Sequence, residues 1–136
     1  MGPVNWVGVI AATLAALALG GVWYGPLFGR AKLAAVGPGG LAARLRPGQT
    51  LALTAAALFI SAAMMGHMFA RLPAGDLAAK PWLYFMMSGG LAAMFVIPAL
   101  WTSYAHQRIA TTVALIDGGY WLAAYLAMGA AFWALA

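Results

Sequence analysis

Residues 109–121 read IATTVALIDGGYW, and the apolar character of this stretch continues almost unbroken to Ala136. About 20 apolar residues form a helix long enough to cross the hydrocarbon core of a bilayer. One acidic residue, Asp117, lies inside this run, and the whole chain contains only two acidic residues. A carboxylate at the centre of such a helix costs about 2.5–3.5 kcal/mol on insertion scales. Asp117 is therefore a candidate for a special structural or functional role.

The composition indicates an integral membrane protein. The chain is 65% hydrophobic and 7% charged, with a mean hydropathy of +0.92, whereas a soluble domain is about 25% charged. The absence of cysteine excludes disulfides, thiolate metal sites and cysteine catalysis. The net charge of +5 comes from bases between apolar runs, which is typical of topology signals and anionic-lipid contacts. We expect the lipid bilayer as a partner and no nucleic acid.

Charged residues divide the chain into four apolar segments, and in lipid each segment is expected to be a helix because its backbone must satisfy its own polar groups. The sequence therefore predicts an all-α integral membrane protein, a four-transmembrane-helix bundle forming a single domain over residues 1–136. The predicted spans are about 4–27, 49–70, 81–104 and 110–135, with a loop at 28–48. The first span lacks the basic start of a cleaved signal peptide, so we expect it to be a membrane span.

The distribution of bases predicts the orientation. The first and third connections carry five bases and the second carries two. The positive-inside rule then places both termini outside and loop 28–48 in the cytoplasm. We expect a multi-pass membrane protein. Inside the loop, the glycines and proline at 37–40 predict a break, and residues 41–46 predict a short interfacial helix.

Small residues at a four-residue spacing predict close helix packing, since helices in lipid associate through short backbone approaches and polar contacts. Rows of this kind occur in the first and last spans, and the neighbour is either in the same chain or in another protomer. The rows are Gly8, Ala12, Ala16 and Gly20; Gly21, Gly25 and Gly29; and Gly119, Ala123, Ala127 and Ala131. The glycines predicted to pack are Gly8, Gly20, Gly21, Gly25, Gly118 and Gly119.

Asp117 lies about seven residues into the last span, roughly 10 Å below the cytoplasmic interface at 1.5 Å per residue. Three interpretations remain open: a hydrogen-bonded structural carboxyl, an ion pair with an inward-reaching base, or a site for a proton, cation or substrate. The bases within reach are Arg30, Lys32 and Arg108, and the hydroxyl partners at the same depth are Tyr24, Thr102 and Tyr104. Pro98 predicts a kink beside this layer that frees the Met94 carbonyl.

Gly118 and Gly119 follow the acid directly and indicate either a locally opened helix or tight packing, of which tight packing is favoured. His67, with methionines on both sides, is assigned to the opposite end of the bundle, where it meets water or headgroups. No catalytic residue, cofactor or metal site is predicted.

Three strings carry a resemblance to a known family: Asn5-Trp6, WYGPLFG at 23–29 and IDGGY at 116–120. On these residues the chain resembles an uncharacterised family of small four-helix bacterial membrane proteins, catalogued as domain of unknown function 1761. The resemblance implies the fold and a place in the bacterial cytoplasmic (inner) membrane, but no activity. With the predicted topology, it places one polar cluster toward the cytoplasm. Its candidate members are Trp23, Tyr24, Pro26, Asp117 and Tyr120, with Thr102 as a further hydroxyl.

Two functions fit these observations. The first is a self-associating structural or accessory protein, whose partner is a second copy or a larger membrane protein. The alternative is a small homo-oligomeric transporter or channel that uses Asp117 as a proton or cation site. An enzyme is not expected, because the layer of Asp117 contains no second acid, base or metal ligand.

Overall fold

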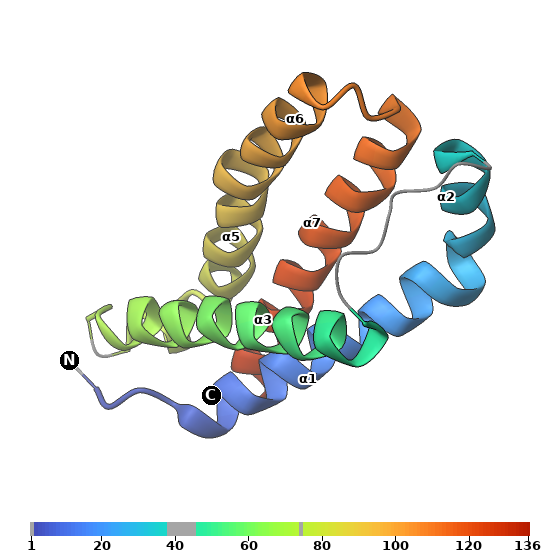
Figure 1. The fold of residues 1–136 in the computed structure, drawn as a ribbon. Coiled ribbons are helices and arrows are strands. Elements are labelled where there is room, and N and C mark those ends of the chain that lie inside the picture. The colour runs from blue at the N-terminus through green and yellow to red at the C-terminus, as the bar shows by residue number, and fades with distance from the viewer. Residues whose placement is uncertain (1, 38–45, 74) are drawn as a thin grey trace.

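The computed structural model describes residues 2–37, 46–73 and 75–136, and the regular structure in these ranges is all helical (Figure 1). The helices are α1 (Trp6–Val22), α2 (Gly29–Val36), α3 (Pro47–Ala70), α4 (Asp76–Ala79), α5 (Trp82–Leu91), α6 (Ile97–His106) and α7 (Thr111–Ala134). Two π-helical turns, η1 (Trp23–Leu27) and η2 (Ala92–Val96), interrupt the first and third apolar stretches. The prediction of an all-α fold is confirmed for the described residues.

Four helical stretches are long and apolar enough to cross a membrane. They are Trp6–Leu27, Pro47–Ala70, Trp82–His106 and Thr111–Ala134. The segment predicted as a loop, 28–48, contains a helix near its start, because α2 covers Gly29–Val36. Residues 31–36 are mostly strong helix formers, and the helix ends at Gly37, whose φ of +80° favours glycine. The rest of the predicted break and most of the predicted helix at 41–46 fall on residues 38–45, outside the described residues.

Helix α7 is the centre of the fold. It contacts α1 and α2 on one side and α5, η2 and α6 on the other, while α3 packs chiefly against α1 (Figure 1). In its most apolar window 56% of the residues are buried, against 28% or less in the other three stretches. The helix that carries Asp117 is therefore the one that the other helices surround.

Hydrogen bonds join α1 to α7 at both ends and in the middle. The Asn5 side chain caps α1 by accepting from the Gly8 amide at 2.9 Å, and its Nδ2 donates to the Leu135 carbonyl at 2.9 Å. Halfway along, the Tyr120 hydroxyl donates to the Ala16 carbonyl at 3.1 Å. Figure 1 shows that the two chain ends lie at the same end of the fold, with the α6–α7 turn and α2 at the other.

Two of the predicted glycines in α1 face α7 at short range. A Cβ atom on Gly8 would lie 2.8 Å from the Phe132 ring, and one on Gly20 would lie 3.2 Å from the Tyr120 hydroxyl. Both positions admit an aromatic side chain of α7 that a larger residue would displace. They fit the expectation that the first and last apolar stretches approach closely.

The other predicted rows do not all make close contacts. Cβ atoms on Gly21 and Gly25 would meet no described atom within 4 Å. In α7 the tightest approach is at Gly129, where a Cβ atom would lie 2.8 Å from the Tyr84 carbonyl oxygen and press on the Ser88 hydroxyl. Gly129 was missed because the predicted row of α7 followed Gly119 and its alanines, whose face of the helix is only half-buried.

The two π-helical turns occur next to prolines. Pro26 lies inside η1 and has no amide hydrogen, and the Phe28 amide donates to the Trp23 carbonyl five residues earlier at 2.8 Å. The second turn, η2, precedes Pro98, so the predicted irregularity lies one turn earlier than the proline itself. A π-helical turn inserts an extra residue and so changes which face the following helix presents.

Candidate functional site

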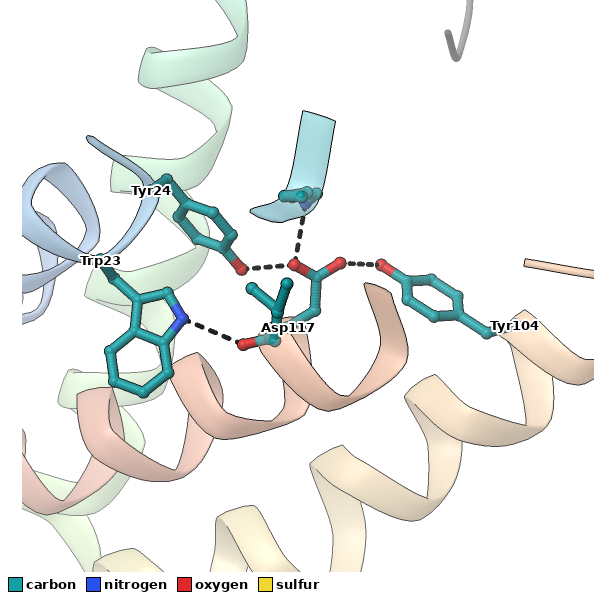
Figure 2. A network of polar contacts seen from close by, with 6 residues as sticks. Trp23, Tyr24, Tyr104 and Asp117 are labelled. Carbon is teal, nitrogen blue, oxygen red and sulfur yellow. Dashed lines mark hydrogen bonds and ion pairs between the residues drawn. The ribbon is translucent and has the colours of Figure 1, made fainter. Parts of the chain in front are cut away.

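The carboxylate of Asp117 accepts hydrogen bonds from three side chains (Figure 2). Its Oδ1 accepts from the Tyr24 hydroxyl at 2.7 Å and from the Lys32 ammonium at 2.8 Å, and its Oδ2 accepts from the Tyr104 hydroxyl at 2.6 Å. The donors come from η1, α2 and α6, while Asp117 belongs to α7. One buried carboxylate, 4% exposed, therefore joins four segments of the chain.

Lys32 is the base that pairs with Asp117. The two side chains are 31% and 5% exposed, so the ammonium reaches a buried carboxylate from the edge of the protein. The same ammonium lies 4.6 Å from the centre of the Tyr24 ring, within the range of a cation–π contact. Among the open interpretations, the structure supports an ion pair combined with hydroxyl hydrogen bonds. Removing either partner would leave a poorly compensated charge on the other, which is costly where that charge is buried.

Trp23 holds the neighbouring turn of α7. Its indole Nε1 donates to the Ile116 carbonyl at 3.0 Å, as Figure 2 shows, and its ring packs on the Phe28 ring with 4.7 Å between centroids. A Cβ atom on Gly119 would lie 3.0 Å from the Trp23 ring. Gly119 therefore makes room for the indole that positions the start of α7.

Tyr120 supports the site without contacting the carboxylate. Its hydroxyl donates to the Ala16 carbonyl, while its ring lies 5.2 Å from the Tyr24 ring. One turn of helix separates Tyr120 from Asp117, so its long side chain points toward the middle of α1. The Tyr120 ring packs against the Tyr24 ring and so limits the positions that the Tyr24 ring can take.

Two predicted cluster members lie outside the network. The Thr102 hydroxyl is exposed and donates to the Pro98 carbonyl of its own helix at 2.8 Å, a common local bond for threonine in helices. Tyr104, the other hydroxyl that the sequence placed at this depth on the same helix, makes the contact. Thr102 and Tyr104 are two residues apart, so their side chains point to different faces of α6. Pro26 is exposed and shapes η1 without touching Asp117.

Glycines beside the acid serve close packing. Helix α7 is continuous from Thr111 to Ala134, so it is not opened at Gly118 and Gly119. A Cβ atom on Gly118 would lie 3.3 Å from the Trp101 indole nitrogen. The favoured interpretation of these glycines agrees with this geometry.

The described residues contain no group of three or more His, Cys, Asp or Glu side chains that would hold a metal ion. His67 lies near the other end of the fold, where its Nδ1 is 3.0 Å from the Ala63 carbonyl oxygen and its ring contacts Trp6 edge-on. It is not part of the Asp117 network.

Over the described residues, these features define an all-helical protein with four helices of membrane-crossing length and one buried carboxylate on α7 that accepts hydrogen bonds from η1, α2 and α6. The chain belongs to the family described as "Protein of unknown function (DUF1761)", whose model matches residues 7–132. The resemblance drawn from the sequence strings is thereby confirmed. No curated protein and no solved structure matches the chain. Two of the three strings that carry the resemblance, 23–29 and 116–120, contain Trp23, Tyr24 and Asp117, which meet in the network.

Replacing Tyr104 with phenylalanine removes one donor to the carboxylate and keeps the ring. Hydrogen bonds to charged groups contribute about 1.5–3 kcal/mol, so we expect Tyr104→Phe to lower the free energy of unfolding by about that amount. The matched control is Thr102→Val on the same helix, for which we expect a change below about 0.5 kcal/mol. Thermal unfolding in detergent, followed by circular dichroism, compares them. Equal melting temperatures for the two variants would contradict the network.

Proposed function

We propose that the protein is an integral membrane protein that crosses the bilayer four times and serves a structural or accessory role. Large apolar side chains on the outer faces of several helices support the membrane assignment, because a surface of this kind is unfavourable in water. Examples are Ile10 and Leu14 on α1, Ile60 and Met64 on α3, and Met94 and Phe95 on η2, each more than half exposed.

The bases support an orientation with α2 and the α6–α7 turn in the cytoplasm and both chain ends outside, in a bacterial inner membrane. Five bases belong to the cytoplasmic connections in this arrangement and two, Arg71 and Lys80, to the outer one. Lys32 lies on the same side, so the ion pair with Asp117 forms near the cytoplasmic interface.

The orientation can be tested by labelling single cysteines, since the chain has none of its own. Ala34 in α2 and Ala79 in α4 are both exposed. We expect a membrane-impermeant maleimide to label Ala79→Cys in spheroplasts, in which the outer membrane is removed, and to label Ala34→Cys only after the inner membrane is permeabilised. The reverse pattern would overturn the orientation, and labelling of both without permeabilisation would overturn the four-span arrangement.

The occupied carboxylate supports a structural role for Asp117. Both of its oxygens accept hydrogen bonds from the chain, and its side chain is 5% exposed. Cavities of about 580, 370 and 250 Å³ are lined by other residues. A carboxylate whose acceptor positions are taken by protein donors is already satisfied, and a carrier site needs access for its cargo. We infer that Asp117 holds α1, α2, α6 and α7 together, without catalysis.

One observation favours the alternative of a proton- or cation-coupled transporter. Lys32 is about one-third exposed, so a movement of its side chain toward water would open a route from the cytoplasmic edge to Asp117. In that function the ion pair would be broken and reformed as protons or cations pass. The structural role requires a permanent pair.

Proton flux separates the two functions. The protein is reconstituted in vesicles that enclose a pH-sensitive dye, and an outward or inward pH gradient is applied. We expect flux equal to that of protein-free vesicles for the wild type and for Asp117→Asn, together with a lower melting temperature for the variant. Flux above background in the wild type that is lost in Asp117→Asn would overturn the structural role and support the transporter.

Self-association is supported by the open glycines at the cytoplasmic end of the first apolar stretch. Gly21 and Gly25 are four residues apart, exposed, and contact no described side chain at their Cα positions. Gly-xxx-Gly spacing lets two helices approach closely in lipid. Because no described residue of the chain lies within 4 Å of these two Cβ positions, we propose a second copy as the neighbour.

Replacing Gly25 with leucine fills the proposed contact between protomers. We expect Gly25→Leu to reduce the protein mass measured by light scattering in detergent from an oligomer to a monomer, with the melting of the protomer little changed. Gly90→Leu on α5, whose Cβ position is also open, is the matched control and should keep the wild-type mass. A monomeric wild type, or an oligomer that survives Gly25→Leu, would contradict the proposal.

A further inference from the structure

A second site lies at the end of the fold far from Asp117. A cavity of about 580 Å³ is bounded by the ends of α3 and α7, by α4 and by the start of α5. Phe132, which lines it, is 15 residues beyond Asp117 on α7, or about 22 Å along the helix. The volume falls within the range of about 300–1,000 Å³ typical of sites for small molecules.

Aromatic side chains form the walls of this cavity. The Phe69 ring lies 4.8 Å from the Tyr84 ring and 5.2 Å from the Phe132 ring, and Trp133 lines the cavity beside them. Phe132 packs between two glycines, since a Cβ atom on Gly8 would lie 2.8 Å from its ring and one on Gly66 would lie 3.4 Å from it. The walls are therefore rigid and formed without an occupant.

The Tyr84 hydroxyl lacks a partner in the described part of the chain. The other four tyrosines each donate a hydrogen bond: Tyr24, Tyr104, Tyr120 and Tyr125. Tyr84 is only 6% exposed, yet none of the fully enclosed side-chain nitrogen or oxygen atoms in the described residues lacks a partner. Its hydroxyl must therefore be the part that reaches open space, and the space that Tyr84 lines is the cavity. Such a group is satisfied when an occupant supplies an acceptor.

The lining also limits the charge of an occupant. None of the residues that line the cavity has a charged side chain, and the only lining amide side chain, Asn5, already bonds to Gly8 and Leu135. A buried charge without a partner is strongly unfavourable, so a phosphate headgroup would be poorly accommodated. An apolar body with one acceptor oxygen is the complementary ligand.

We propose that this cavity binds an uncharged, lipid-soluble molecule with a ring body and an acceptor oxygen, to which Tyr84 donates a hydrogen bond. Phe69, Phe132 and Trp133 pack against the rings. The site shares no residue with the Asp117 network. An experiment that contradicts this ligand site therefore leaves the proposed structural role of the network unaffected, and the reverse also holds.

Benzophenone is a suitable probe because it is uncharged and has two rings and one carbonyl oxygen. On irradiation, its excited carbonyl takes a hydrogen atom from a nearby C–H group, and the two carbon radicals join in a new C–C bond. The purified full chain in detergent is labelled over a range of probe concentrations, and the label is mapped by mass spectrometry. We expect saturable labelling on cavity residues, whereas the exposed Met86 and Met94, which line none of the cavities, report unsaturable background labelling.

Two neighbouring alanines of α4 provide a matched pair of variants. Ala78 and Ala79 are both exposed, but only Ala78 lines the cavity. We expect Ala78→Phe to fill the cavity and reduce saturable labelling at least about tenfold, and Ala79→Phe to label as the wild type does, with equal melting temperatures for both. Equal labelling of the two variants, or labelling of the wild type at background level only, would overturn the site.

The role of the hydroxyl is tested by Tyr84→Phe, which keeps the ring. We expect its half-saturation concentration to rise about three- to tenfold, the loss of one hydrogen bond. Competition gives a second measurement on the unaltered protein. Fluorenone, which has the carbonyl, should compete several-fold better than diphenylmethane, which lacks it. An unchanged half-saturation in Tyr84→Phe together with equal competition would overturn the assignment of the acceptor.

Discussion

The structure depends on how one buried negative charge is compensated. A carboxylate removed from water needs donors and a counter-charge close by, and Asp117 obtains them from three separate segments. Tyr24 and Tyr104 supply hydroxyls from opposite sides, and Lys32 supplies the charge. Because these donors belong to η1, α6 and α2, satisfying the carboxylate also sets where each of those segments lies relative to α7.

The irregular turns are what bring the donors to the carboxylate. In η1 the amide of Phe28 bonds five residues back, and the chain then turns tightly enough that a Cβ atom on Gly29 would lie 2.5 Å from the Tyr24 carbonyl oxygen. Helix α2 starts from that turn. The Lys32 side chain therefore lies over the Tyr24 ring, and its ammonium bonds to Asp117. The family string at 23–29 therefore encodes both the tyrosine donor and the turn that delivers the lysine.

The two ends of the fold differ in whether their buried tyrosine hydroxyls have hydrogen-bond acceptors among the described residues. At the α2 end the Tyr24 and Tyr104 hydroxyls donate to Asp117 and the Trp23 indole donates to the Ile116 carbonyl, and this network suits a structural role. At the other end the Tyr84 hydroxyl has no acceptor among the described residues, and Tyr84 lines an aromatic cavity, an arrangement that suits a ligand. Helix α7 connects both ends and is held to α1 at its middle by Tyr120. With the roles proposed above, the Asp117 network fixes the helices at one end of the fold, and the binding site lies at the other end.

By itself, the sequence determined the helical class, the four apolar stretches and the importance of Asp117, because hydropathy and charge spacing depend only on residue order. It also brought Trp23 and Tyr24 to the right depth, since rise per residue is constant along a helix. Only the tertiary structure decided between Lys32 and the arginines, between Tyr104 and Thr102, and between Gly129 and the alanine row. The first two choices depend on how α2 and α6 are rotated after the π-helical turns η1 and η2, and such turns depend on packing as well as on local sequence. The third depends on which face of the continuous helix α7 the other helices cover. The cavity at Tyr84 was likewise invisible in the sequence, because it forms where the consecutive helices α3, α4 and α5 meet the end of α7, which is far from them in the chain.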